Sequence, residues 1–186
     1  MNQNSETELR ATLATIQQQN LLLQNRLDEQ DRKLNCIFKE CPYSFVRNNC
    51  SCYKVINRTA TWNDARYSCS TMGAHLVHVQ NAEEQQTIGR QVASHYFEGD
   101  GFVSNQGFWL GGYDLKPPNT TVGVDGVWTW ETTNQNLTYF NWSEGEPNNW
   151  GGTDEDCLLM TYNIGYTWND DICTNTHVYI CEIDLV

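Results

Sequence analysis

Thr61-Trp62-Asn63-Asp64-Ala65-Arg66-Tyr67 is a short stretch that carries the signals with which a helix begins. The hydroxyl of Thr61 can accept a hydrogen bond from a backbone N–H group that the first helical turn leaves unpaired. Asp64 places a carboxylate near the positive end of the helix dipole. The stretch therefore predicts a helix that starts just after Thr61.

Other parts of the chain predict a second helix and several short strands. Residues 82–92 are rich in Glu and Gln and predict a helix, whereas residues 74–79 alternate as a strand does. Short aromatic and β-branched runs follow, separated by clusters of Gly, Pro and Asn. Two early helices followed by several short strands indicate an α+β fold. The later runs lie at 108–110, 127–130, 158–162 and 178–181.

Residues 1–36 contain apolar side chains at a regular spacing that alternates between four and three residues. This spacing, without Gly or Pro, is typical of a coiled coil. Asn20 falls at an a position, where a buried amide fixes the register and often favours two strands. We predict a coiled-coil neck at 1–36 that joins two or three copies of the chain, followed by a globular domain at 37–186. The alternative is a single amphipathic helix folded back on that domain. The d positions are Leu9, Ile16 and Leu23, and the a positions are Leu13, Leu27 and Leu34.

Three short segments combine carboxylates with side-chain amides and contain no basic residue. They are Glu146-Pro147-Asn148, Glu155-Asp156-Cys157 and Trp168-Asn169-Asp170. Calcium accepts about six to eight oxygen ligands from carboxylates, amide carbonyls, backbone and water. An ion held in this way can complete its shell with the hydroxyl groups of a sugar. The predicted Ca²⁺ ligands are Glu146, Asn148, Glu155, Asn169 and Asp170.

From Cys41 to about Glu182, the chain resembles the C-type lectin-like domains. Each motif is weak alone, but their order and spacing together are specific. The resemblance implies an α+β fold of two helices, short antiparallel strands and long loops stabilised by disulfides, with a carbohydrate-binding function and no enzymatic activity. The motifs are Cys41-Pro42, Cys52-Tyr53, Trp62-Asn63-Asp64-Ala65-Arg66, Cys69, Gly73-Ala74-His75-Leu76-Val77, Glu83-Glu84-Gln85, Phe108-Trp109-Leu110-Gly111, Trp128-Thr129-Trp130, Phe140-Asn141-Trp142, Glu146-Pro147-Asn148, Trp168-Asn169-Asp170, Cys157, Cys173 and Cys181.

Eight cysteines indicate an oxidising compartment, where disulfides persist. Cysteine count and spacing alone leave the pairing open. Two cysteines fall outside the pairs that the resemblance implies: Cys36 and Cys50 either pair with each other, or Cys36 cross-links neighbouring chains. The implied pairs are Cys41 with Cys52, Cys69 with Cys181, and Cys157 with Cys173.

The resemblance also bears on sugar specificity. Family members with the Glu-Pro-Asn triplet bind mannose, N-acetylglucosamine, fucose or glucose, and those that bind galactose carry Gln-Pro-Asp. Each of two vicinal hydroxyls can donate to a carboxylate and accept from an Asn N–H. Trp150, followed by Gly151 and Gly152, resembles the stacking Trp of galactose binders, so galactose remains an alternative. The expected carbohydrate-binding residues are Glu146, Asn148, Trp150, Glu155, Asn169 and Asp170, and the family holds the bond before Pro147 cis.

An auxiliary calcium site that is present in many relatives is altered in this sequence. Asp114 and Asp156 match its acidic ligands, but Pro118 and Asn149 replace expected acids. We therefore do not expect a second calcium ion.

Charge and composition argue against several other classes of function. The formal net charge of −12 argues against nucleic acid and anionic membranes as partners, because both require basic patches. Glu146 and Glu155 resemble the paired carboxylates of a glycosidase, but the interleaved amides favour a cation site over a general acid. A lectin-like domain that binds protein is the second alternative, although all five predicted calcium ligands are present. We expect glycans or glycoproteins as the partners.

Three Asn-X-Ser/Thr sequons, at Asn57, Asn119 and Asn136, are typical of a glycoprotein that passes through the secretory pathway. The sequence contains neither a signal peptide nor a run of about twenty apolar residues. We expect an extracellular protein, either secreted or the ectodomain of a membrane-anchored precursor.

Overall fold

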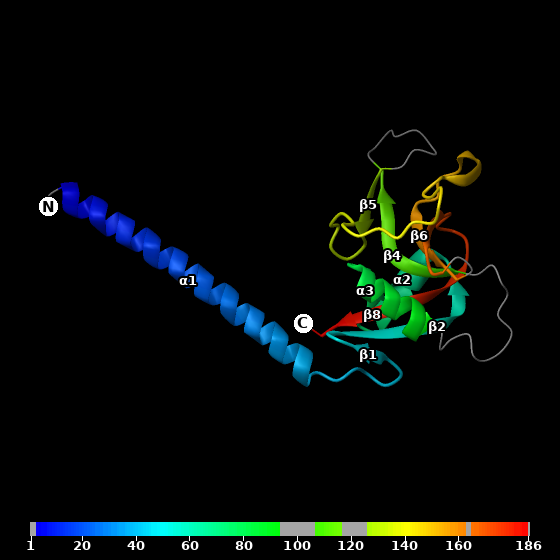
Figure 1. Ribbon diagram of the computed structural model, residues 1–186, viewed down its shortest axis with the longest axis horizontal. Coiled ribbons are helices and arrows are strands. Elements are labelled where there is room, and N and C mark those ends of the chain that lie inside the picture. Colours follow the sequence, from blue (N-terminus) through cyan, green and yellow to red (C-terminus); the bar gives the residue numbers. More distant parts are fainter. Residues whose placement is uncertain (1–2, 94–106, 117–125, 163–164, 186) are drawn as a thin grey trace. The chain divides into compact units, whose positions relative to one another are not determined.

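The computed structural model describes residues 3–93, 107–116, 126–162 and 165–185 (Figure 1). Its backbone contacts divide the chain into two units. The first comprises Met1–Glu40 with Leu185–Val186, and the second comprises Cys41–Asp184.

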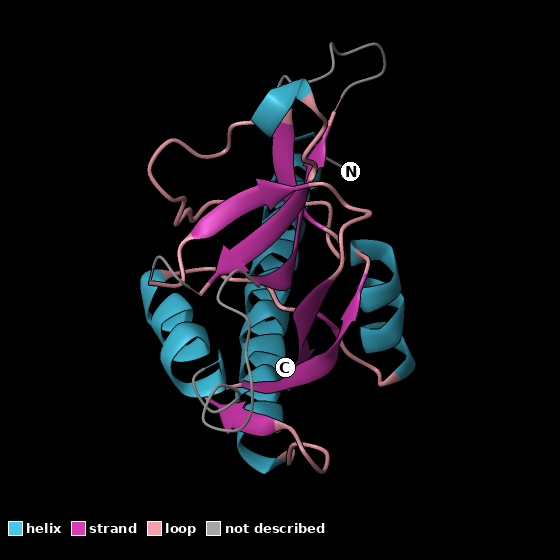
Figure 2. Ribbon diagram, turned by 90° about the vertical axis from the view of Figure 1, so that its right-hand side faces the viewer, coloured by secondary structure: helices cyan, strands magenta, loops and turns pink. Residues whose placement is uncertain are grey.

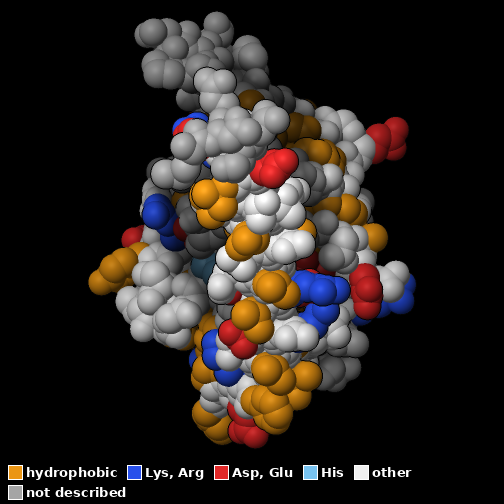
Figure 3. All heavy atoms as spheres, turned by 90° about the vertical axis from the view of Figure 1, so that its left-hand side faces the viewer, with side chains coloured by type: hydrophobic (Ala, Val, Ile, Leu, Met, Phe, Trp, Pro, Cys, Tyr) orange, Lys and Arg blue, Asp and Glu red, His pale blue; other side chains and the backbone are white. Residues whose placement is uncertain are grey.

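Helix α1 spans Gln3–Phe38 without interruption, which confirms the helix that the periodic spacing predicts. Apolar side chains of the a and d positions lie on its surface, with Leu9 70% and Ile16 46% exposed. Figure 3 shows apolar side chains following this helix. Exposed ion pairs one turn apart, such as Lys33 Nζ to Glu29 Oε1 at 2.7 Å, add weakly to the stability of the helix. Pairing with a second copy stays a prediction.

The second unit is built on one sheet, in which the described residues form eight strands. The strands follow the order β1-β2-β8-β4-β6-β7, with β3 paired to β8 and β5 paired to β4. All pairs are antiparallel except β4 with β8. Two short helices flank the strands on either side (Figure 2). The elements are β1 (Val46–Asn48), β2 (Ser51–Ala60), α2 (Trp62–Thr71), β3 (His75–Leu76), α3 (Ala82–Thr87), η1 (Ile88–Ala93), β4 (Gly107–Leu115), β5 (Val127–Trp130), η2 (Trp150–Gly152), β6 (Cys157–Thr161), β7 (Trp168–Asp171) and β8 (His177–Asp184).

Both predicted helices are present. Thr61 caps α2, because its side chain accepts a hydrogen bond from Asp64 N at 3.2 Å. Asn81 caps α3 in the same way, accepting from Glu84 N at 2.9 Å. After Thr87 the predicted second helix continues as the π-helical turn η1. Early helices and short strands together confirm the α+β fold.

Large aromatic side chains fill the core. Trp109 and Trp168 are fully buried, and each indole N–H has a partner. Trp109 Nε1 donates to the carbonyl of Ala60 at 2.9 Å, and Trp168 Nε1 donates to Gln85 Oε1 at 2.8 Å. A buried tryptophan can therefore pack apolar surface without leaving its polar atom unpaired.

Disulfides join elements that are distant in sequence. The three pairs that the resemblance implies are present, and the bond between Cys69 and Cys181 has a sequence separation of 112. Closing such a loop stabilises the fold by about 4–5 kcal/mol on the chain-entropy model. Cys36 and Cys50 are disulfide-bonded as well.

The strands agree only in part with the sequence-based prediction. β5 coincides with the predicted run 127–130. The predicted strand 74–79 is reduced to the two residues of β3, and the backbone of the next residue is shared between β8 and β4. Val77 N donates to Ile180 O, and Gly111 N donates to Val77 O. Strands β1, β2 and β7 were not predicted.

Candidate glycan-binding site

Two paired strands bring part of the predicted ligand set together. Asn169 and Asp170 lie on β7, which pairs antiparallel with β6. Glu155 stands just before β6, which begins at Cys157. The disulfide from Cys157 to Cys173 joins this end of β6 to the segment that follows β7. Glu155 is therefore held close to the end of β7.

Asp170 attaches the Glu-Pro-Asn segment to β7. Its side chain is fully buried, and both carboxylate oxygens accept from Asn148 N, at 3.1 and 3.0 Å. Asn149 N donates to Asp170 Oδ2 at 2.7 Å. The peptide bond between Glu146 and Pro147 is cis, as the resemblance implies. The side chain of Asn148 is exposed, so its backbone rather than its amide makes these bonds.

Asn149 connects the loop to Glu155, a role that the sequence analysis missed. The residue adopts the left-handed conformation (φ 48°, ψ 56°) and is 4% exposed. Its Oδ1 accepts from Glu155 N at 3.0 Å, and Trp150 N donates to Glu155 Oε2 at 2.6 Å. Asn tolerates this backbone conformation better than other residues with a side chain. The sequence signal for this role is an Asn that directly precedes Trp-Gly-Gly.

Three acidic side chains gather in the site, those of Glu146, Glu155 and Asp170. No described basic side chain forms an ion pair with them. Burial, a side-chain interaction with Asp170 and the nearby carboxyl group of Glu155 together raise the pKa of Glu146 to about 7. Glu146 Oε2 is buried without a hydrogen-bond partner. Burial also raises the pKa of Glu155, as do the charges of Asp170 and Asp171, whereas the Trp150 N–H lowers it. This donor set of carboxylates and amides fits a hard divalent cation.

Asn169 contributes an amide at the same place. Its side chain is half-buried, and Nδ2 donates to the main-chain carbonyl of Asp170. The contact brings an amide group and a main-chain oxygen together beside the buried carboxylate. Both are oxygen-bearing groups of the kind that calcium accepts.

Comparison with known proteins identifies the family. The family model for the lectin C-type domain matches residues 58–183 of the chain. The chain belongs to the C-type lectin domain family. Perlucin of Haliotis laevigata is 34% identical over 143 residues, which cover 76% of this chain and 82% of perlucin. The C-type lectin lectoxin-Enh4 of Pseudoferania polylepis is 32% identical over 148 residues, covering 78% of this chain and 84% of the relative.

A solved structure of another C-type lectin domain supports the same assignment. The carbohydrate-recognition domain of cow CD23, determined in the presence of a GlcNAc2Man3 oligosaccharide, is 28% identical and superposes with a TM-score of 0.60. The match covers 78% of this chain and 96% of that one. C-type lectin domains are generally non-enzymatic, which agrees with the expectation of a binding protein.

Trp150 of this C-type lectin lies on the surface beside the acidic groups. It begins the short turn η2, and the residue is 77% exposed. Gly151 and Gly152 follow with φ of 71° and 73°, a conformation that glycine adopts readily. The turn therefore leaves one aromatic face accessible to a ligand.

Lys116 is a second residue that the sequence analysis missed. Its Nζ lies 2.6 Å from Asp154 Oδ1, 2.7 Å from Asp156 Oδ1 and 3.9 Å from Asp114 Oδ2. Burial lowers the pKa of this ammonium, but hydrogen bonds to Asp154 and Asp156 raise it more, so the pKa lies above its usual value. Asp154 and Asp156 flank Glu155 in sequence.

The position of Lys116 bears on the auxiliary calcium site. Asp114 and Asp156, the two matching acids of that site, both face the ammonium group of this lysine. Pro118 lies outside the described residues, and Asn149 bonds to Glu155 and Asp170 instead. A positive side chain therefore stands between the two acids that match the auxiliary calcium site.

Proposed function

We propose that this C-type lectin domain binds glycans through a calcium ion held by Glu146, Asn148, Glu155, Asn169 and Asp170. The observation that carries the proposal is the buried, unpartnered Oε2 of Glu146 beside two further carboxylates. Like charges so close together require a cation or protons to offset them. Cow CD23, a relative with the same fold, was solved in the presence of an oligosaccharide.

In this proposal, the ion, the carboxylates and the amides each contact the sugar hydroxyls in a different way. Calcium, when bound, supplies coordination positions that two neighbouring hydroxyls can occupy. The carboxylates of Glu146 and Glu155 accept hydrogen bonds from those hydroxyls, and the amides of Asn148 and Asn169 donate to them. This pairing of one acid with one amide supports vicinal hydroxyls of the mannose, N-acetylglucosamine or fucose type.

Galactose-type glycans are the alternative, and the exposure of Trp150 favours them. An aromatic face stacks on the apolar face of a sugar ring, and Trp150 is exposed at the start of a glycine-rich turn. The two readings differ in which matrix retains the protein. Mannose-agarose retention supports the first specificity, and galactose-agarose retention supports the second.

The first prediction tests the ion and the sugar together. Glu155→Gln and Asn169→Ala should each lower the affinity for both calcium and sugar at least tenfold, or about 1.4 kcal/mol, because the same atoms hold both. Glu144→Gln is the matched control, since Glu144 is exposed in the same loop and lies outside the proposed ligand set. Calorimetry and a sugar column with calcium or chelator are the measurements. Unchanged retention in excess chelator would contradict the proposal and would favour a protein-binding domain.

We also propose that the chain is extracellular and forms a homo-oligomer through α1. All eight cysteines are disulfide-bonded, which supports an oxidising compartment. Of the sequons, Asn57 and Asn136 are exposed and accessible to glycosylation, whereas Asn119 lies outside the described residues. No helix among the described residues is long and apolar enough to span a membrane. The exposed apolar stripe of α1 supports pairing with a second or third copy.

A further inference from the structure

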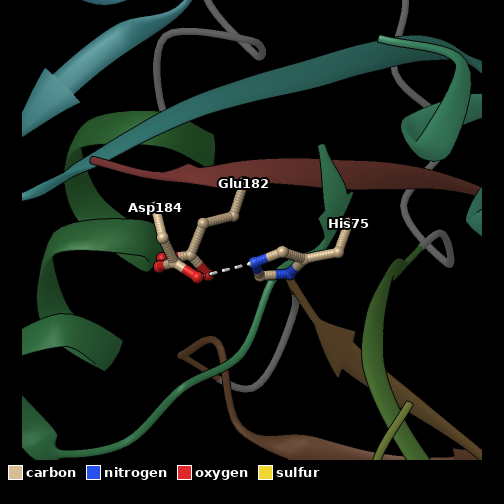
Figure 4. A group of neighbouring side chains, drawn as sticks. All are labelled: His75, Glu182 and Asp184. Carbon is tan, nitrogen blue, oxygen red and sulfur yellow. Dashed lines mark hydrogen bonds and ion pairs between the residues drawn. The ribbon is translucent and has the colours of Figure 1, made fainter. Parts of the chain in front are cut away.

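Three metal-ligating side chains converge at the edge where β3 meets β8 (Figure 4). The two strands are antiparallel, and His75 lies directly opposite Glu182 in the register. Asp184 follows two positions later on β8, so its side chain points to the same face as Glu182. The ligand atoms of all three lie within 4.8 Å of one another, and His75 Nε2 is 3.2 Å from Asp184 Oδ2.

A backbone contact orients the His75 ring. Its Nδ1 lies 2.8 Å from the carbonyl oxygen of Leu76. A carbonyl only accepts, so Nδ1 carries a hydrogen and Nε2 is the nitrogen that faces Glu182 and Asp184. Histidines that bind metals have this arrangement, with the second ring nitrogen donating to a carbonyl or carboxylate.

The carboxyl groups of Glu182 and Asp184 differ in burial and in their hydrogen-bond partners. Glu182 is 3% exposed, and its Oε2 accepts from His78 N at 3.0 Å. Burial raises its pKa to about 7. Asp184 is more exposed, and its hydrogen bond with His75 lowers its pKa. Glu84 adds a third carboxylate nearby and accepts from the hydroxyl of Tyr53 at 2.9 Å.

A second histidine and a cavity lie beside this group. The ring centroids of His75 and His78 are 4.4 Å apart, and burial lowers the pKa of His78. A cavity of about 200 Å³ reaches Glu182 and Asp184 from the surface, which provides a path for an ion and room for a water molecule.

We propose that His75, Glu182 and Asp184 form a second metal site, which takes a divalent ion of the zinc class. One imidazole nitrogen and two carboxylates suit Zn²⁺, whereas Ca²⁺ favours a larger shell made only of oxygen. Binding replaces the proton on His75 Nε2 with the metal and releases that proton to solvent. Three protein ligands leave the fourth tetrahedral position for water on the cavity side.

This site is separate from the glycan site. Figure 1 shows the end of β8 and the turn near residues 150–152 on opposite sides of the second unit. Metal bound here joins β3 to β8 and stabilises the native chain by mass action, independently of sugar. The proposal thus does not depend on the proposed lectin function.

Titration of the full chain with ZnCl₂ in buffer that contains saturating CaCl₂ tests the site. Calorimetry should give one zinc per chain, and zinc should raise the melting temperature. His75→Gln and Asp184→Asn should each weaken zinc binding at least tenfold while they leave melting without zinc close to that of the parent. Glu83→Gln is the control, because Glu83 is an exposed acid that lines the same cavity. It should bind zinc as the parent does.

Several outcomes overturn the proposal. They are no zinc binding by the parent chain in the micromolar range, equal binding by both ligand variants, or a loss of binding in Glu83→Gln as large as in His75→Gln. The last result would mean diffuse attraction of cations to an acidic surface. Displacement of zinc by millimolar calcium would indicate an oxygen-ligand site instead.

Discussion

Two polar side chains, Asp170 and Asn149, organise the proposed glycan site. Asp170 accepts hydrogen bonds from the backbone N–H groups of Asn148 and Asn149, and the Asn149 side chain accepts another from Glu155 N. Asp170 and Glu155 also stand among the proposed calcium ligands. Loop order and ion binding therefore involve the same atoms, so a change in one changes the other.

The second prediction, at the same scale, concerns pH. The pKa of Glu146 is raised to about 7 from 4.5, so a proton competes with calcium near neutral pH. In the ion-free protein, a raised folded-state pKa means that stability falls as pH rises from about 4.5 through 7. Calcium reverses this trend because it binds the deprotonated carboxylates.

We therefore expect calcium affinity and sugar retention to fall when pH is lowered from about 8 to about 6. Calorimetric titration and column retention at several pH values measure the effect. Glu144→Gln should reproduce the profile of the parent, and Glu146→Gln should bind weakly at every pH. Retention that does not change over this range would show that Glu146 is not a ligand.

Among the elements, Lys116 connects β4 to the segment that precedes β6. This residue follows directly after β4, and its ammonium group contacts Asp154 and Asp156 on the other segment. A backbone bond from Asp114 N to Asp156 O, at 2.8 Å, adds to the connection. The lysine thus fixes both neighbours of Glu155, and it is a positioning residue for the proposed site.

The third prediction follows from this contact. Lys116→Met leaves three close carboxylates without their cation and should lower the free energy of unfolding by about 1–2 kcal/mol, a value discounted because two of the acids are partly exposed. Calcium affinity should fall as well, while Lys116→Arg should keep most of both. Lys33→Met, which removes an exposed helical ion pair, is the control.

Chemical denaturation gives the stability of each variant, and calorimetry gives its calcium affinity. If Lys116→Met loses stability but binds calcium as the parent does, the lysine supports the fold without positioning Glu155. Equal stability of Lys116→Met and the parent would contradict the role altogether.

For the whole molecule, the proposed pairing of copies through the exposed stripe of α1 would give the proposed glycan site a means of reaching high avidity. A surface site that contacts one sugar through two hydroxyls and one ring should bind weakly, with a Kd of roughly 1 mM. Linking two or three such sites raises apparent affinity for spaced glycans without any new contact. The helix would then serve recognition as well as assembly.

The fourth prediction tests this avidity. Deletion of residues 1–35 should leave monosaccharide affinity unchanged and weaken binding to a glycan-coated surface by about 100-fold or more. Leu13→Lys with Leu27→Lys should act similarly, because both side chains belong to the predicted a positions. Gln18→Lys with Asn25→Lys adds the same charge on the opposite face as a control. Sedimentation and surface binding are the measurements, and a full-length chain that sediments as a monomer would contradict the prediction.

Local sequence determined the elements whose signals lie within a few residues. The cap at Thr61, the apolar spacing of α1 and the aromatic run of β5 each act over one or two helical turns or one strand. Helix starts and amphipathic faces depend on neighbours in the chain, so they can be predicted without the fold. Motif order and spacing were likewise sufficient to identify the family.

Tertiary structure alone decided which distant side chains meet. β7 is composed of Trp168 and three polar residues, so no local preference marks it, and its pairing with β6 creates the strand. Lys116 reaches Asp154 across a sequence separation of 38, and His75 reaches Asp184 across 109. Such contacts form only after the sheet has closed the intervening loops, because chain entropy otherwise keeps these residues apart.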